Sequence, residues 1–136
     1  ISESATKLIE SFWPGPLTML FKPKHTIPKF ITTGLIGIRQ PGSSVTRKIL
    51  AELNLPLTAP SANISGEAPA TSAKQVKDCL GGKVDLILDA GFCKGGKPST
   101  LIDTTQKPIQ LIRKGAIDFK KIKMSLNHSL ETEESS

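Results

Sequence analysis

The sequence predicts an α+β fold, a twisted mixed parallel and antiparallel sheet covered by helices. Apolar residues recur at helical spacing in several stretches, short apolar runs of strand length lie between them, and two such runs follow one another across a turn. With 136 residues, 38% of them hydrophobic, the chain can bury a core, which argues against a disordered protein. We expect one domain over residues 1–127 and a disordered acidic tail over residues 128–136.

The first third of the chain predicts one helix and two strands. An amphipathic helix over Glu3–Phe12 ends there because Pro14 disfavours helix in the residue before it. A Pro-Gly-Pro turn then leads into a strand at Leu17–Phe21. The apolar run Leu35–Arg39 ends at a Pro-Gly turn and predicts a central strand.

The middle third predicts two helices and two strands around a loop of small residues. Ser43 or Ser44 caps a helix that Asn54 closes, and residues 57–59 restart as a strand. The loop PSANISGEAPATS, residues 60–72, is rich in residues that tolerate close backbone approach to a ligand. A helix capped by Thr71 or Ser72 ends at Gly81 and Gly82, and residues 84–91 predict a buried strand and turn.

The last third predicts a pair of strands and a helix. Residues 96–105 and 108–115 each carry a strand, and the turn TTQKP separates them. Asp118 then opens a helix that turns Phe119, Ile122 and Leu126 inward.

Charge and cysteine usage narrow the function classes. The net charge is +6, and removing the three glutamates of the tail leaves +9, which favours anionic partners such as nucleotide phosphates or an RNA backbone. No apolar run approaches the ~20 residues that cross a bilayer, so we expect no membrane partner. Cys79 and Cys93 are too few for a structural zinc site, and we expect both to be small buried or half-buried side chains in a reducing cytoplasm.

Polar residues at strand ends form a chemically coherent set. Two arginines can bind a carboxylate and a phosphate through paired hydrogen bonds, while hydroxyls and an amide fix orientation. This describes an amino acid beside a nucleotide, and we expect the set to converge on one hollow at one side of the sheet. Its members are Arg39, Ser61, Asn63, Ser99 and Arg113.

Two other chemistries find little support in the sequence. The only histidines, His25 and His128, are expected to be solvent-exposed, so nucleophilic catalysis by a Ser-His-Asp triad is improbable. The stretch GFCKGGKPST imitates a phosphate-binding P-loop, but Pro98 separates its lysine from the serine and strand-forming residues follow. Lys94 and Lys97 can still steer phosphates or RNA.

Six motifs in order resemble the YrdC-like domain of the threonylcarbamoyl-AMP synthase family. They are FWPGPLT (12–18), GIRQP (37–41), PLTAPSANISG (56–66), DLILDAG (85–91), PSTLID (98–103) and LIRKGAI (111–117). The resemblance runs from Phe12 to Ile117, and the Ser-Ala-Asn-x-Ser-Gly and Pro-Ser-Thr elements together are its most specific part.

The resemblance implies a cytoplasmic nucleotidyltransferase. Such an enzyme converts L-threonine, bicarbonate and ATP, with magnesium on the nucleotide, into threonylcarbamoyl-AMP and pyrophosphate for tRNA N6-threonylcarbamoyladenosine modification. It implies direct contacts with tRNA or double-stranded RNA and with partner proteins of that pathway as further expectations. Matched residue by residue, Ser61, Asn63 and Arg113 hold the nucleotide, and Arg39, Ala59 and Ser99 hold threonine; no residue matches a protein nucleophile or a metal ligand.

The chain also departs from the family pattern. Nothing before Phe12 resembles the Pro-Thr-x-Thr segment or the Lys-x-x-x-Arg pair of the family, so we expect an N-terminally incomplete chain with little activity alone. Leu35 stands where relatives often carry threonine, and Pro69 stands where some carry a phosphate-contacting serine.

Two alternatives stay open at this point. The first is an RNA-binding module without catalysis that uses the basic body, although aromatic residues that could stack on bases are few. The second is the similar domain of carbamoyltransferases that mature hydrogenases. Testing whether added ATP and threonine affect RNA binding would distinguish the enzyme from the RNA-binding module. The sequence upstream of Ile1 would distinguish it from the carbamoyltransferase domain.

Overall fold

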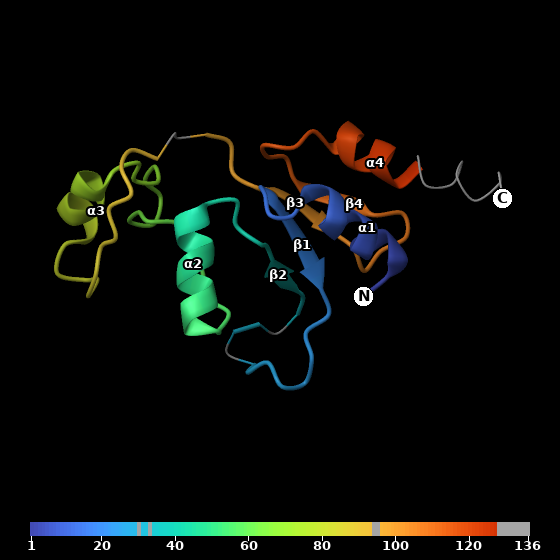
Figure 1. Cartoon of the computed structure of the whole chain (residues 1–136), viewed down its shortest axis with the longest axis horizontal. Helices are drawn as coiled ribbons and strands as arrows, with labels where there is room; N and C mark the ends of the chain where they lie inside the picture. The colour runs from blue at the N-terminus through green and yellow to red at the C-terminus, as the bar shows by residue number, and fades with distance from the viewer. Residues whose placement is uncertain (30, 33, 94–95, 128–136) are drawn as a thin grey trace. The chain divides into compact units, whose positions relative to one another are not determined.

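A computed structural model of the chain describes residues 1–29, 31–32, 34–93 and 96–127. The helices and strands are α1 (Glu3–Phe12), β1 (Leu17–Phe21), β2 (Ile36–Ile38), α2 (Ser44–Leu53), α3 (Ala73–Leu80), β3 (Thr100–Asp103), β4 (Gln110–Arg113) and α4 (Phe119–Asn127) (Figure 1). They group into two compact units, residues 1–47 with 97 onward, and residues 48–96. The division falls within α2, so each unit is described by itself.

The first unit contains a four-stranded mixed sheet in the order β2-β1-β3-β4. Strand β1 pairs parallel with β3 and antiparallel with β2, and β3 pairs antiparallel with β4. This confirms the predicted α+β class with its mixed sheet and its strand pair across the TTQKP turn. One detail was wrong: β2 lies at the edge of the described sheet and is shorter than Leu35–Arg39, because β1 alone pairs with it.

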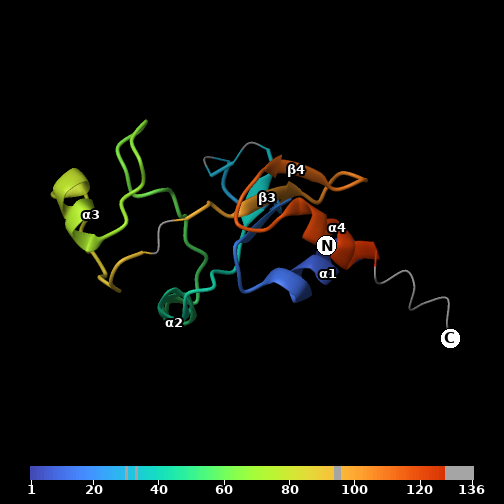
Figure 2. The ribbon, with the colours of Figure 1, turned by 90° about the horizontal axis from the view of Figure 1, so that it is seen from above.

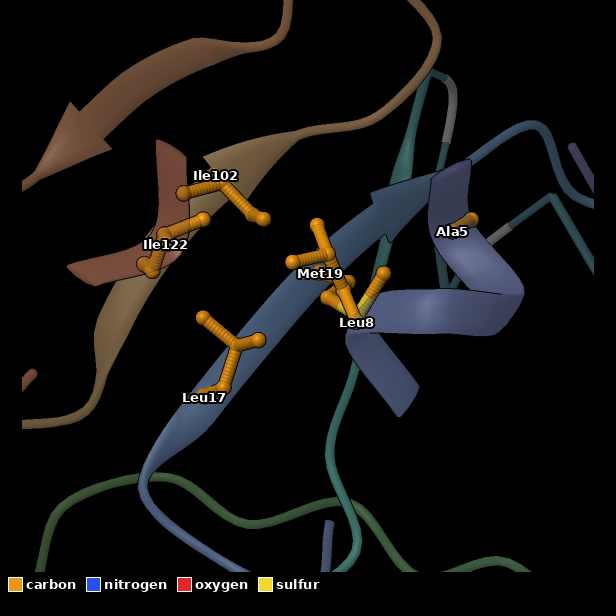
Figure 3. Close-up of a cluster of buried hydrophobic side chains, with 6 residues drawn as sticks. All are labelled: Ala5, Leu8, Leu17, Met19, Ile102 and Ile122. Carbon is orange, nitrogen blue, oxygen red and sulfur yellow. The ribbon is translucent and has the colours of Figure 1, made fainter. Parts of the chain in front are cut away.

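The hydrophobic core lies between this sheet and the helices α1 and α4, which pack side by side on one face of it (Figure 2). Leu17 and Met19 alternate along β1 toward the helices, where Leu8 of α1 and Ile122 of α4 meet them (Figure 3). These four side chains are fully buried, and Phe119 and Leu126 pack around them as predicted. Thr18, which stands between Leu17 and Met19 in β1, therefore faces the other side of the sheet.

The turn before β1 holds Trp13 against the core. Its indole Nε1 donates to the Leu17 carbonyl at 2.7 Å, and its ring packs against the core. The Gly15 amide donates to the Gln40 carbonyl at 2.9 Å, which ties the Pro-Gly-Pro turn to the segment after β2. Both bonds fix the start of β1.

The second unit contains α3 and most of α2, both where the sequence predicted them. Ser43 caps α2 and Ser72 caps α3, each hydroxyl accepting a backbone N–H at 3.3 Å. Gly82, at φ 79°, takes the left-handed conformation after α3, and Asn54, at φ 48°, takes it after α2.

Two predicted strands in this unit were wrong. Residues 57–59 and 84–91 form no strand, and Leu86 and Leu88 are 75% and 62% exposed rather than buried. An apolar run becomes a strand only when a neighbouring strand pairs with its backbone, and no described segment does so here. Cys93 is likewise exposed, contrary to expectation, whereas Cys79 is half-buried as expected.

The tail, residues 128–136, and with it His128, lies outside the described residues, and the domain boundaries at 127 and 128 stay predictions. No helix in the described ranges is both long enough and apolar enough to span a membrane.

Candidate functional site

A cluster of two hydroxyls and a guanidinium lies at one end of the sheet, on the side away from the core. It consists of Thr18, Ser99 and Arg113, and we call it the hydroxyl–guanidinium cluster. Ser99 immediately precedes β3, Arg113 ends β4 and Thr18 is the second residue of β1. Because β1 and β3 run parallel while β4 runs antiparallel to them, the starts of β1 and β3 and the end of β4 lie at the same end of the sheet.

Three hydrogen bonds fix the Arg113 guanidinium against Ser99. Nη2 donates to the Ser99 carbonyl at 3.0 Å and to its Oγ at 3.1 Å, and Nε donates to the same carbonyl at 3.3 Å. The side chain is otherwise exposed, and its Nη1 has no hydrogen-bond partner within the described ranges. An anchored arginine with one free edge is prepared to bind an anion, since little further side-chain entropy is lost.

Ser99 also contacts Thr18. The two hydroxyl oxygens lie 2.7 Å apart, although the residues are 81 positions apart in sequence. Both side chains are half-buried. Sequence reasoning missed Thr18 as a site residue; the available signal was a polar side chain between the buried Leu17 and Met19, which alternation places on the opposite face.

The backbone around Ser99 is held by the turn after β4. The Ala116 amide donates to the Pro98 carbonyl at 2.9 Å, and the fully buried Thr100 hydroxyl bonds both the carbonyl and the amide of Ile117, at 2.7 and 3.0 Å. Gly115 fits between them, where a Cβ would overlap the backbone of residues 98–100. The position of Ser99 therefore depends on this turn.

Arg39 lies in the same unit, at the end of β2. The register pairs Met19 with Ile38, and one step further in that register sets Thr18 opposite Arg39. The Arg39 side chain is exposed and forms no hydrogen bond or ion pair with described residues. The predicted residues Arg39, Ser99 and Arg113 thus lie at the same end of one sheet, Arg39 after β2, Ser99 before β3 and Arg113 at the end of β4.

The other predicted residues, Ala59, Ser61 and Asn63, lie in the second unit, in a loop that we call the Ser-Ala-Asn loop (residues 59–70). The loop folds on itself: the Ala70 amide donates to the Ala62 carbonyl at 2.9 Å, and Gly66 takes φ 92°. Ala59 and Ser61 are exposed. Whether this loop converges with the hydroxyl–guanidinium cluster stays a prediction, since the two belong to different units.

The amide of Asn63 organises the loop. Its Nδ2 donates to the carbonyls of Ile64 and Glu67 at 2.9 and 3.0 Å, so both amide hydrogens are used and the two carbonyls fix which atom is nitrogen. Its buried Oδ1 accepts no hydrogen bond from the described residues. In this arrangement Asn63 has no amide donor left for a ligand.

Replacing Asn63 with alanine should loosen the loop. Two hydrogen bonds are lost, each worth about 1 kcal/mol, so amide exchange at Glu67 and Ala70 should accelerate on the order of tenfold in the full-length protein. Hydrogen-exchange measurements check this, with Ser61→Ala as the control because the Ser61 side chain makes no bond in the loop. Equal exchange in both variants would contradict the role given to Asn63.

Lys97 lines a different feature, a surface hollow of about 600 Å³ that Lys114 and Phe119 share. Neither Ser99 nor Arg113 lines this hollow. The expectation that Lys97 steers anions stays a prediction, and Lys94 lies outside the described residues. His25 is exposed, as the sequence predicted.

The chain also matches a known family model, Sua5/YciO/YrdC, described as telomere recombination, over residues 1–115. The chain belongs to the Sua5/YciO/YrdC family. Threonylcarbamoyl-AMP synthase of Pyrococcus abyssi is 39% identical over 124 residues, which cover 90% of this chain and 36% of that protein. A putative threonylcarbamoyl-AMP synthase of Methanocaldococcus jannaschii is 38% identical over 122 residues, 90% of this chain and 58% of that protein.

Solved structures of the Sua5/YciO/YrdC family confirm the fold. The crystal structure of P. abyssi Sua5 complexed with L-threonine superposes with a TM-score of 0.87 at 36% identity, covering 92% of this chain and 37% of that one. E. coli YciO superposes with a TM-score of 0.80 at 28% identity, covering 90% and 61%. This chain therefore spans only part of the length of the relatives that it matches.

Proposed function

We propose that this chain contributes the hydroxyl–guanidinium cluster and the Ser-Ala-Asn loop to the active site of an L-threonylcarbamoyladenylate synthase. The observation that carries the proposal is the anchored Arg113 guanidinium, held on Ser99 with one edge free for an anion. Membership of the family, with relatives named as threonylcarbamoyl-AMP synthases and a Sua5 structure bound to L-threonine, supports this substrate class.

In this proposal Ser99, Arg39 and Ala59 bind L-threonine, and Arg113, Ser61 and Asn63 bind ATP. The donors of Asn63 serve the loop, so its support of the nucleotide is indirect, through loop shape and the exposed Ser61 hydroxyl. Arginine supplies the charge-assisted bonds that carboxylate and phosphate oxygens require. Bicarbonate is the third substrate, and tRNA modification in the cytoplasm is the use of the product.

The reaction is positional and electrostatic. The amine of L-threonine and bicarbonate combine to a carbamate with loss of water. An oxygen of this carbamate attacks the α-phosphorus of ATP, the bond to the β-phosphate oxygen breaks, and pyrophosphate leaves. The chain aligns the two substrates and its guanidinium neutralises the growing negative charge, which requires no protein nucleophile.

Magnesium enters this proposal on the nucleotide. The described residues hold no group of three His, Cys, Asp or Glu side chains, and the unpartnered buried oxygen among them, Asn63 Oδ1, is neutral. Such residues suit an ion held mainly by ATP phosphates and water, the usual environment of Mg²⁺. Bound there, it neutralises phosphate charge.

The test is product formation by the full-length protein. With L-threonine, bicarbonate, ATP and Mg²⁺, mass spectrometry should detect threonylcarbamoyl-AMP, and pyrophosphate release should require all three substrates. RNA binding that is indifferent to added ATP and threonine, with no product formed, would favour the non-catalytic alternative.

A further inference from the structure

The contact between Thr18 and Ser99 has no role in the core. Thr18 faces away from Leu17 and Met19, and among the described residues its hydroxyl makes a single hydrogen bond, the 2.7 Å contact with Ser99 Oγ. The Thr104 hydroxyl, by contrast, bonds the backbone and donates to the Leu20 carbonyl at 2.6 Å. Thr18 instead bonds a hydroxyl that is itself part of the candidate site.

The Thr18–Ser99 pair has more hydrogens than its internal hydrogen bond uses. Each hydroxyl has one hydrogen and two lone pairs, and the 2.7 Å bond uses one hydrogen of the two, whichever oxygen donates. Arg113 Nη2 supplies its own hydrogen to Ser99 Oγ, so it takes none. No other described group accepts from either hydroxyl, which leaves the pair with one hydrogen to donate to an outside acceptor.

The surroundings favour an anionic acceptor. The Arg113 guanidinium donates to Ser99 Oγ, which polarises that hydroxyl and strengthens it as a donor, and its free Nη1 edge adds positive charge beside it. A donor hydroxyl next to a guanidinium matches a carboxylate oxygen.

Thr18 is also held firmly enough to act as a support. Threonine has a restricted χ1 angle in a strand, and the Thr18 Cγ2 methyl lies beside Gly37 of β2, so close that an added Cβ there would approach it at 3.3 Å. The Ser99 hydroxyl, lying between Thr18 and Arg113, is thereby directed by two neighbours.

We propose that Thr18 is a positioning residue for substrate recognition: it orients the Ser99 hydroxyl so that the Thr18–Ser99 pair presents one hydrogen to the carboxylate of the amino-acid substrate. The inference rests on the proposed function because it takes Ser99 as a threonine-binding residue. It adds that a β1 residue outside the predicted site sets the affinity for that carboxylate.

The test compares Thr18→Val, which keeps the shape and removes the hydroxyl, with Thr18→Ser, which restores it. In the full-length protein, Thr18→Val should raise the KM for L-threonine about tenfold and leave the KM for ATP within about twofold, and Thr18→Ser should recover most of the loss. In the Ser99→Ala background, Thr18→Val should add little, because the two hydroxyls act as one unit.

The matched control is Thr104→Val, the same substitution on a residue that also bonds β1. It removes a bond to the Leu20 carbonyl without touching the cluster, so the KM for L-threonine should stay at the wild-type value. An unchanged KM in Thr18→Val, an equal rise for both substrates, or a failure of Thr18→Ser to recover the loss would each overturn the inference.

Binding calorimetry separates this inference from the proposed function. Wild-type protein should bind L-threonine more tightly than L-threoninamide, which lacks the carboxylate, and Thr18→Val should lose most of that preference. If wild-type protein binds L-threonine and forms product while Thr18→Val retains the preference, only the role of Thr18 is overturned. If wild-type protein binds no L-threonine, the proposed function is overturned as well.

Discussion

Replacing Arg113 with alanine should weaken ATP binding by the full-length protein about 10- to 150-fold. The guanidinium is already fixed on Ser99, and its free edge provides charge-assisted hydrogen bonds, whose loss costs about 1.5–3 kcal/mol. The affinity for L-threonine should fall too, because Nη2 also holds the Ser99 hydroxyl. Calorimetric titration with each substrate measures both effects.

The variant Arg113→Lys separates charge from geometry. Lysine keeps the positive charge, but its single nitrogen cannot reproduce the three hydrogen bonds that Nε and Nη2 of Arg113 donate to Ser99. We expect it to recover part of the ATP affinity and little of the L-threonine affinity. An ATP affinity of Arg113→Ala equal to wild type would refute the phosphate-binding role.

The sequence predicted the first unit well because local signals and packing agree there. In β1 the alternation of Leu17, Thr18 and Met19 matches a sheet with helices on one face, and α1 has its apolar residues at helical spacing. Pattern and burial point to the same strands, so the hairpin of β3 and β4 was also predictable. The edge position of β2 was not, since strand order depends on pairings that periodicity does not encode.

In the second unit the same reasoning failed for a physical reason. Val84, Leu86 and Leu88 alternate as in a strand, but a strand requires a partner for its backbone, and none of the described segments supplies one. The helices α2 and α3, whose hydrogen bonds lie within the segment, were predicted correctly. Short-range signals therefore sufficed for helices and failed for pairing.

In the candidate site, too, the sequence predicted single residues but not the contacts between them. Ser99 and Arg113 were identified separately, from motif and from strand-end position, but their three hydrogen bonds depend on the register of β3 against β4. That register shifts between Leu101 and Ile102, and no sequence pattern predicts this irregularity. Thr18 was missed because its partner is 81 residues away.

Replacing Gly115 with alanine should disturb the site more than the addition of one methyl group suggests. A Cβ there would overlap the Thr100 amide nitrogen, the Pro98 carbonyl oxygen and the Ser99 carbonyl carbon, all of them backbone atoms that cannot rotate away. The turn must then move off the start of β3, which strains the Ala116–Pro98 bond and the two bonds of the Thr100 hydroxyl. Overpacking of this kind costs about 1–3 kcal/mol of stability.

The loss of activity should exceed the loss of stability. Ser99 lies within the displaced segment, and its bonds to Thr18 and Arg113 have lengths of 2.7–3.3 Å that a shift of about 1 Å would break. Since misplacement on that scale can cost about 100-fold in rate, we expect kcat/KM to fall by roughly that factor while the protein still folds, with a melting temperature lowered by several degrees. Gly34→Ala is the matched control, because a Cβ there meets nothing within 4 Å. Wild-type activity in Gly115→Ala would mean that the turn after β4 does not set the position of Ser99, and the geometric basis of the site would have to be sought elsewhere.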